Sequence, residues 1–507
     1  MKATLSIDSK AYVIIAIFVV ALLFVISPDS CTHDLFDRTD SAIFFMSGKS
    51  WMNGMVPYVD FTDTKGPLLW LIYGAGYVLS KTDYIGVFWI SCLFVIASYL
   101  LTFKVSCIFL SVRRSLIITL LMTLVYFNPV INYEIRCEDF CMPFILLALY
   151  RTCLHLYQDS KSFYLSSFLL GLSIGVTAMM KYSMAIDMCV FVPFVLYACH
   201  KDGYSVCRCL LYAMLGFLLP TVPFAVYFIH IGHFNDFING YFLFPLHTVG
   251  KYGGGMFRGI YFRLTMNAET LAWLLSSAVT PLLIPYMKRY HWFPLIASSW
   301  FSLVTFHNAI YPYYYSCCAP FMIFLPVALL WMFSSISHDN IPLWYHKSIA
   351  EASVFIVIFV LTVFKNLGYY YYNQQSGDRE QHLKNMFFQN DGTNVWRVAY
   401  HKYADKMCER RKPKVLYLNS LERHGFEMQS QGLPACKYWF FPNGGDARIL
   451  EQQKDICRKG IPDYVFVTNE DEVDKSFLES LGYHRFYCED IDFTMYINAK
   501  SFRRVSL

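Results

Sequence analysis

Long apolar segments, separated by short polar ones, recur along the first three quarters of the chain. A membrane-spanning helix needs about 20 mainly apolar residues, and the pattern reaches that length repeatedly. The predicted spans centre on residues 11–27, 84–103, 115–130, 141–157, 163–180, 184–199, 209–231, 268–287, 292–307, 317–335 and 349–367. The apolar stretch 66–80 is shorter and predicts a re-entrant or interfacial helix. We therefore expect a polytopic α-helical membrane protein with about eleven transmembrane helices.

The basic residues fall in alternate loops between these spans. They are Lys104, Arg113, Arg114, Lys161, Lys201, Arg208, Lys288, Arg289 and Lys347. Loops rich in lysine and arginine stay on the cytoplasmic side, which places the N-terminus inside. The first apolar segment is long for a signal peptide and lacks a small-residue cleavage site near Ser27, so we expect an uncleaved first helix. An odd number of spans then puts the C-terminus on the extracytoplasmic side.

The sequence takes on the character of a soluble domain after residue 368. The runs 414–420, 436–442 and 463–469 predict short buried strands, and the amphipathic run 471–483 predicts a helix. The cysteines of this region permit one or two disulfides in an oxidising compartment; they are Cys408, Cys436, Cys457 and Cys488. It has no nucleophile motif or phosphate loop, so a lid or docking role is the simplest interpretation.

These patterns predict two domains. Residues 1–368 form the transmembrane domain, with residues 28–65 as its first extracytoplasmic loop. Residues 369–507 form a small extracytoplasmic α/β domain after a short linker.

Composition supports the membrane assignment and argues against nucleic-acid binding. Of 507 residues, 56% are hydrophobic and only 16% are charged, whereas soluble domains carry about 25% charged residues. The net charge of +5 is spread along the chain without a basic tract, so we expect no nucleic-acid partner. The 16 cysteines include no metal-type CxxC pair, and most of them fit small buried side chains.

The ionisable residues of the apolar region gather in its predicted outer loops. They are Asp40, Lys49, Asp60, Asp63 and Lys65 in the first loop, then Glu134, Arg136, Glu138 and Asp139, the isolated Lys181, and the tyrosine-rich run 308–316 with Tyr313 and Tyr314. A charge at membrane depth costs a few kcal/mol and is usually paired or functional. We therefore expect these residues to face a polar cavity at the outer leaflet.

These residue types suit transfer of a group from a lipid-linked phosphate. Lysine and tyrosine donors bind phosphate oxygens, and lysine stabilises the charge of a departing phosphate group. A carboxylate held off the phosphate can accept the proton of an acceptor hydroxyl. The sequence has no phosphate loop of the ATP type, so a lipid-linked donor fits better than a nucleotide.

Each residue of the first loop also has a structural interpretation. Asp40 would cap an interfacial helix that starts at Ser41. Asp60 and Asp63 would shape the loop through Asx turns, or pair with the neighbouring lysine. Lys49 fits a solvated or interfacial lysine.

The later outer loops have structural interpretations as well. Lys181 would extend to the outer headgroups. Glu138 and Asp139 would hold Arg136, or else contribute to acceptor or metal binding. The glycines of 251–257 suggest an outer segment that orders when substrate binds.

The first loop resembles that of GT-C fold glycosyltransferases, in the branch that includes protein O-mannosyltransferases and lipid A aminoarabinose transferases. The matching residues are Asp40, Ser41, Phe44, Gly54, Pro57, Tyr58, Asp60, Asp63, Thr64, Lys65, Gly66 and Pro67. The segments 133–150, 179–186 and 310–320 resemble later parts of the family pattern, and Tyr313 occupies a position that is often histidine. The resemblance covers residues 10–335 in order.

The resemblance implies an inverting glycosyltransferase that uses a polyprenyl-phosphate sugar, carried on undecaprenyl phosphate in bacteria or dolichyl phosphate in eukaryotes. Asp40 matches the catalytic carboxylate that activates the acceptor, and Lys65 matches the ligand of the lipid phosphate. The residues that match additional phosphate contacts are Lys181 and Tyr313 or Tyr314. The residues that would support the active-site loop are Tyr58, Asp60, Asp63, Glu138 and Asp139.

Two positions depart from the family pattern. Ser41 stands where many members have a second carboxylate, and Ile43 stands where aminoarabinose transferases have an arginine. The resemblance therefore implies the general chemistry and leaves the sugar and the acceptor open.

The resemblance also implies partners and a location. We expect a polyprenyl-phosphate-linked sugar and an acceptor lipid, glycan or protein as substrates, and no cofactor; a divalent metal is compatible with the chemistry but no motif indicates one. The C-terminal domain resembles those of bacterial members, which implies the bacterial cytoplasmic (inner) membrane with this domain in the periplasm.

Three other functions are weighed against transfer from a lipid-linked monosaccharide. A transporter or flippase would carry charges in mid-span and inverted repeats, and the sequence shows neither pattern. An oligosaccharide polymerase or ligase would rely on arginines in long outer loops, where only Arg258 and Arg263 stand out. A noncatalytic GT-C-like scaffold fits the loss of the second carboxylate at Ser41.

Overall fold

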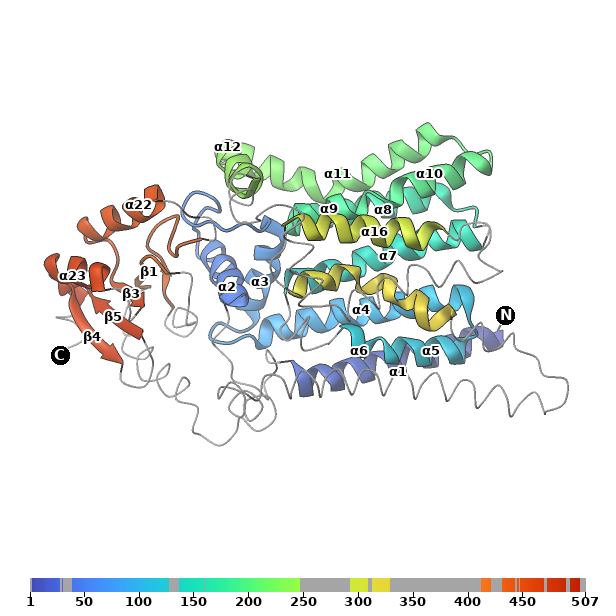
Figure 1. Cartoon of the computed structure of the whole chain (residues 1–507), viewed down its shortest axis with the longest axis horizontal. Coiled ribbons are helices and arrows are strands. Elements are labelled where there is room, and N and C mark those ends of the chain that lie inside the picture. The colour runs from blue at the N-terminus through green and yellow to red at the C-terminus, as the bar shows by residue number, and fades with distance from the viewer. Residues whose placement is uncertain are drawn as a thin grey trace. The chain divides into compact units, whose positions relative to one another are not determined.

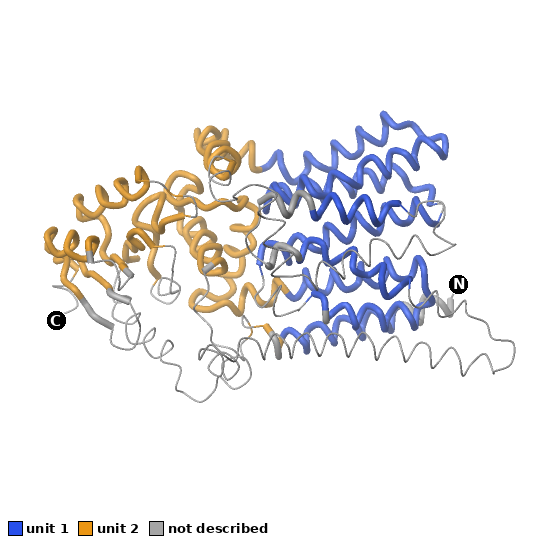
Figure 2. Tube along the Cα trace, in the orientation of Figure 1, with its two compact units in different colours: residues 1–23, 92–223, 253–383 blue, residues 24–91, 224–252, 384–507 orange. Residues whose placement is uncertain are grey.

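The computed structural model describes most of the helical region and part of the C-terminal region (Figure 1). The described residues are 2–27, 30, 39–126, 136–158, 160–246, 292–308, 312–328, 412–420, 431–442, 445, 447–468, 472–488 and 493–501. The predicted spans 268–287 and 349–367 and the predicted domain boundary at 368 lie outside them. The chain divides into two compact units (Figure 2), residues 1–23, 92–223 and 253–383, and residues 24–91, 224–252 and 384–507.

The first unit is built from long apolar helices. Its elements, some of which continue into the second unit, are α1 (Lys2–Ile26), α4 (Ile85–Phe109), α5 (Val112–Leu121), α6 (Thr123–Tyr126), α7 (Cys137–Tyr157), α8 (Phe163–Met180), α9 (Tyr182–Met188), α10 (Phe191–Lys201), α11 (Val206–His230), α16 (Trp292–Asn308) and the 3-10 helix η4 (Pro312–Ile323). Within the described part of the chain, five helical stretches are long and apolar enough to cross a membrane. They are 85–109, 137–157, 163–180, 182–201 and 206–230. The protein is therefore an integral membrane protein.

Three predicted spans differ from straight α-helices. The span predicted at 115–130 is the pair α5 and α6, which are separate at Met122. The span predicted at 184–199 is the pair α9 and α10. The span predicted at 317–335 begins as the 3-10 helix η4, which contains Pro320, and becomes α-helical at 324–328. Proline lacks the N–H that an α-helix interior requires, and hydropathy alone does not reveal such a change.

Glycines allow close packing of α8 against α11. A Cβ atom on Gly171 would lie 1.8 Å from the Ala213 carbonyl oxygen, and one on Gly216 would lie 2.0 Å from the Phe168 carbonyl oxygen. Small residues let helix backbones approach in a membrane, where apolar side chains gain little by leaving lipid. The two helices therefore make backbone-to-backbone contact.

The second unit combines outer helices with a small sheet. Its helices include α2 (Thr39–Met52), α3 (Pro67–Leu79), α12 (Phe234–Phe237), the π-helix η1 (Ile238–Leu243), α22 (Ala447–Arg458) and α23 (Glu472–Ser480). The sheet has the order β2-β1-β3-β5-β4. Its strands are β1 (Lys414–Tyr417), β2 (Leu433–Pro434), β3 (Tyr464–Thr468), β4 (His484–Cys488) and β5 (Phe493–Ile497).

The sheet is mixed, and its core is apolar. Strand β1 pairs in parallel with β2 and β3, whereas β5 pairs antiparallel with β3 and β4. The core side chains are Leu416, Leu418, Cys457, Val465, Val467, Leu478, Tyr483 and Tyr496. The region is the small α/β structure that the sequence predicts.

The C-terminal predictions are confirmed in three elements and wrong in one. The runs at 414–420, 463–469 and 471–483 contain β1, β3 and α23. The run 436–442 is not a strand but turns and bends that bury Trp439 and Phe440. Its aromatic residues raise the predicted strand tendency, yet they pack as a loop cluster in which the Trp439 carbonyl accepts one bond, from the Tyr417 amide at 2.7 Å.

Two of the four C-terminal cysteines are described as free thiols. Cys436 and Cys457 belong to the apolar core of the sheet region. Burial raises the pKa of each to about 12, so neither is a reactive thiolate at neutral pH. Cys408 and the side chain of Cys488 lie outside the described part of the chain.

Candidate active site

Helices α2 and α3 pack directly on each other. Gly48 packs on Gly74, where a Cβ on Gly48 would lie 2.3 Å from the Gly74 nitrogen. The Phe44 ring packs edge-on against Tyr73, four residues before Gly48 and one before Gly74. The Asn53 amide donates to the Tyr77 hydroxyl at 3.3 Å, beyond the glycine pair on both helices. The Phe45 ring, three residues before Gly48, packs against the same Tyr77, so the two helices are in close contact around the glycine pair.

The side chain of Lys65 lies close to the beginning of α2. Asp40 lies in the first turn of α2, and Lys65 precedes α3 by two residues. The Lys65 Nζ lies 5.4 Å from the centroid of the Phe44 ring, one turn after Asp40. Both side chains are partly exposed. Lys65 therefore lies near the first turns of α2, and its convergence with Asp40, 25 positions away in sequence, stays a prediction.

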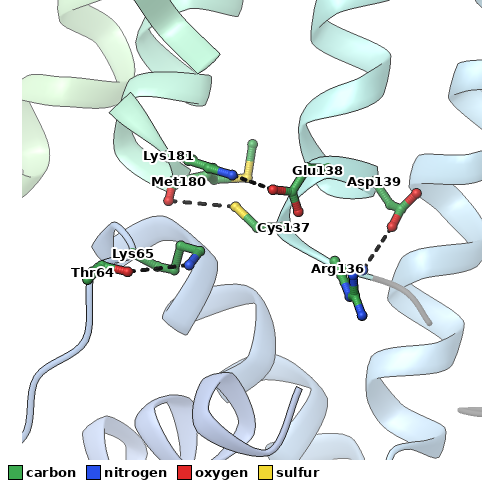
Figure 3. A network of polar contacts seen from close by, with 8 residues as sticks. All are labelled: Thr64, Lys65, Arg136, Cys137, Glu138, Asp139, Met180 and Lys181. Carbon is green, nitrogen blue, oxygen red and sulfur yellow. Dashed lines mark hydrogen bonds and ion pairs between the residues drawn. The ribbon is translucent and has the colours of Figure 1, made fainter. Parts of the chain in front are cut away.

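Electrostatics at this end favour anions. The N-terminal end of α3 carries partial positive charge. Gly66 caps α3 and Pro67 starts it, and Lys65 adds a full positive charge beside that end. Figure 3 shows Lys65 beside Thr64, whose hydroxyl oxygen accepts a bond from Nζ at 3.4 Å. Lys65 and the α3 N-terminus together suit a phosphate group.

The loop between α2 and α3 is shaped by its own polar groups. The Asp60 carboxylate accepts a bond from the Val56 amide at 2.7 Å, and a bridge joins Pro57 to Phe61. Asp60 therefore has the structural role that its sequence context also allowed. Asp63 is buried, and its Oδ1 lies 3.5 Å from the Thr64 hydroxyl while Oδ2 has no hydrogen-bond partner among the described residues.

Lys49 and helix α2 differ from their predicted environment. Lys49 is fully buried, which corrects the interpretation of a solvated or interfacial lysine. Residues 41–50 are all buried, so most of α2 is covered by other parts of the protein. A lone lysine in a polar loop gives no sequence signal for this burial, because the covering segments come from distant parts of the chain.

Lys181 and Glu138 form a buried ion pair in the first unit. Lys181 is the single residue between α8 and α9. Because α10 packs back on α8, the chain turns back near Lys181, as predicted. The lysine is paired with Glu138 in the first turn of α7 (Figure 3), with side chains only 12% and 4% exposed. Lys181 therefore does not extend to the headgroups, and its charge is shared with a carboxylate.

The neighbouring polar residues fix the start of α7. The Asp139 carboxylate accepts a bond from the Arg136 amide at 2.8 Å, which caps the helix. The Cys137 thiol donates to the Met180 carbonyl at 3.7 Å and so joins α7 to the end of α8 (Figure 3). The two acidic residues thus have different partners: Glu138 pairs with Lys181, and Asp139 binds the Arg136 backbone and supports the local structure.

Asp187 is a buried carboxylate that the sequence analysis did not single out. It lies in α9 with 2% of its surface exposed, and its Oδ1 has no hydrogen-bond partner among the described residues. Lys181 and Cys317 lie close enough to interact electrostatically with the Asp187 carboxylate. The available signal was an acidic residue inside the apolar run 184–199, which is costly in a membrane span.

The remaining predicted residues are described less fully. Tyr313 and Tyr314 lie in η4, but their side chains lie outside the described part of the structure. Glu134 also lies outside it. Among the residues that are described, no three histidine, cysteine or acidic side chains are grouped so as to hold a metal ion.

Comparison with known proteins places the fold. No protein-family model matches the chain, and no curated protein sequence matches it. The structure is similar to that of ArnT from Cupriavidus metallidurans bound to undecaprenyl phosphate, with a TM-score of 0.64, 13% sequence identity, and 96% of this chain and 98% of that chain covered. The apo state of the same protein gives a TM-score of 0.58 at 12% identity, with 97% and 99% covered. The chain therefore has the GT-C fold of membrane glycosyltransferases.

Proposed function

We propose that this protein is an inverting glycosyltransferase that moves a monosaccharide from a polyprenyl-phosphate carrier to an acceptor hydroxyl at the outer face of the membrane. The observation that supports this proposal is the position of the Lys65 ammonium group 5.4 Å from the Phe44 ring, one turn after Asp40 in α2. A carboxylate beside an anion-binding helix end supplies the two groups that this transfer needs.

Lys65 holds the donor phosphate in this proposal. Its ammonium group and the α3 N-terminus bind the phosphate oxygens. As the bond between the sugar C1 and the phosphate oxygen breaks, the bonding pair leaves with the polyprenyl phosphate. Lys65 stabilises the negative charge that develops on this leaving group.

Asp40 activates the acceptor. Its carboxylate accepts the hydroxyl proton while the acceptor oxygen forms the new bond to C1 from the opposite face, which inverts the configuration. No group other than donor and acceptor is consumed.

Other residues take supporting roles. Tyr58, Asp60 and Asp63 shape the loop that leads to Lys65. The family resemblance assigns further phosphate contacts to Lys181 and Tyr313 or Tyr314; for Lys181, such a contact requires that the phosphate compete with Glu138 for the ammonium group. Glu138 and Asp139 hold the start of α7.

The fold and the apolar helices support the choice of donor and location. The similar structure of ArnT was determined with undecaprenyl phosphate bound, which makes an undecaprenyl-phosphate sugar the first donor to test. We place the N-terminus in the cytoplasm and the C-terminal region in the periplasm of a bacterial inner membrane, as the basic loops indicate.

Replacing Lys65 with methionine tests the donor site. The variant removes the charge and keeps most of the side-chain volume, so we expect undecaprenyl phosphate to bind at least about tenfold more weakly, because a charged hydrogen bond contributes about 1.5–3 kcal/mol. Binding is measured by titration of the purified protein in lipid nanodiscs. Lys81→Met, at an exposed lysine beyond the other end of α3, is the matched control. Equal affinity of wild type and Lys65→Met would contradict the proposed site.

A further inference from the structure

Tyr58 has an unusual backbone in the loop that leads to Lys65. Its φ angle is 65°, in the left-handed region that residues with a side chain rarely adopt. Such a conformation costs about 1–3 kcal/mol and persists where the surroundings fix it, often at functional sites. The side chain is fully buried.

The hydroxyl of Tyr58 binds the backbone of Lys65. It donates a hydrogen bond to the Lys65 carbonyl oxygen at 3.0 Å. Burial, followed by the effects of Tyr241 and Asp63, raises the pKa of Tyr58 well above its usual value. The hydroxyl therefore stays neutral and keeps its proton for this bond. The bond fixes the peptide group between Lys65 and Gly66, from which α3 begins.

The ring of Tyr58 is held by a second segment, far away in sequence. Phe237 and Tyr241 of this segment place their ring centroids 5.6 and 6.2 Å from that of Tyr58. Phe228 of α11 and Trp70 of α3 complete the packing, with centroids at 5.8 and 4.7 Å. Gly240 lies so close that a Cβ on it would be 2.7 Å from the Tyr58 Cδ1. Gly240 lies in the π-helix η1, a rare helix form that is frequent at functional sites.

We propose that the segment 234–243, formed by α12 and η1, is a positioning element for Lys65 and acts through Tyr58. This inference rests on the proposed function, in which Lys65 binds the donor phosphate. The π-helix brings Gly240 against the Tyr58 ring, the packed ring sustains the left-handed backbone, and the hydroxyl holds the Lys65 peptide. Tyr58 and Gly240 are thus positioning residues that do not touch the substrate.

Tyr58→Phe tests this chain of contacts with the ring preserved. Loss of the hydroxyl leaves the Lys65 carbonyl without this donor, so we expect the affinity for undecaprenyl phosphate to fall about five- to tenfold. The loss should disappear in a Lys65→Met background, where there is no ammonium group left to position. Tyr99→Phe is the matched control, because Tyr99 is also fully buried and donates a 2.8 Å bond, to Thr123.

The outcomes separate the two proposals. If Lys65→Met alone leaves the affinity unchanged, the proposed function fails. If Lys65→Met weakens binding but Tyr58→Phe does not, or if Tyr58→Phe weakens binding equally in both backgrounds, only the positioning role is overturned. A loss that requires Lys65 supports it, since a general packing defect would act in both backgrounds.

Gly240→Ala tests the same contact from the other segment. The added methyl group would displace the Tyr58 ring, so we expect weaker binding of undecaprenyl phosphate that again depends on Lys65. Gly171→Ala provides the matched control, because its Cβ would meet the Ala213 carbonyl in the first unit, whereas Tyr58 belongs to the second. Unchanged affinity in Gly240→Ala, with Lys65→Met impaired, would overturn the role of the π-helix.

Discussion

Replacing Asp40 with asparagine should abolish sugar transfer while donor binding remains. Asparagine has nearly the same size and still forms hydrogen bonds, but it cannot accept the proton of the acceptor hydroxyl. General base catalysis contributes about 10²–10⁴-fold to rate, so we expect turnover to fall by about that factor. The affinity for undecaprenyl phosphate should stay within about twofold, because Lys65 and the α3 N-terminus are unchanged.

This prediction needs both readouts and a matched control. Transfer is followed by the release of free undecaprenyl phosphate, and affinity by titration in nanodiscs. Asp202→Asn changes an exposed aspartate in the turn after α10 and should leave both unchanged. Normal turnover in Asp40→Asn would remove Asp40 from the chemistry, and a lost donor affinity would assign it to binding.

Replacing Lys181 with methionine should strongly destabilise the first unit. The ion pair with Glu138 is almost completely buried, and removal of one partner leaves an uncompensated charge at a cost of about 3–5 kcal/mol. The cost is large here because Asp187, a second buried carboxylate, also lies near Lys181. Thermal unfolding of the purified variant in detergent measures the loss.

A double variant separates charge from packing. Lys181→Met combined with Glu138→Gln removes the unpaired carboxylate and should recover most of the lost stability. If the double variant is no more stable than Lys181→Met, the ion pair is not what stabilises this turn. If Lys181→Met is as stable as wild type, the pair does not form in the folded protein.

The sequence predicted the membrane class and the residues of the candidate site, for physical reasons that are local. Spans such as 163–180 appear because every residue of a membrane helix faces lipid or other helices, so hydropathy alone marks them. Lys181 was predicted to be held in a polar site because no loop surrounds it. Asp40 and Lys65 stood out as charges in an apolar region.

The geometry of the site depends on contacts that no local pattern contains. The close packing of α2 on α3 depends on the contact between Gly48 and Gly74, which a 14-residue connection separates in sequence. The burial of Lys49 requires segments from elsewhere in the chain to cover α2. The pairing of Glu138 with Lys181 joins residues 43 positions apart.

Two errors have the same origin. The run 436–442 carries the aromatic residues of a strand but forms a buried loop, because side-chain packing decided its backbone. Asp187 was overlooked because the surrounding run is apolar, although one acidic residue in such a run is itself a signal. In both cases the average character of a segment concealed the role of single residues.

The most direct test of the central claim is turnover itself. Purified wild-type protein is incubated with a panel of undecaprenyl-phosphate monosaccharides and with membrane lipid, glycan and protein fractions as acceptors, and free undecaprenyl phosphate and labelled product are measured. The account predicts stoichiometric release of undecaprenyl phosphate and transfer of the sugar with at least one donor, and loss of both in Asp40→Asn. The account would be contradicted if the wild-type protein transferred no sugar and if its binding of these donors did not depend on Lys65.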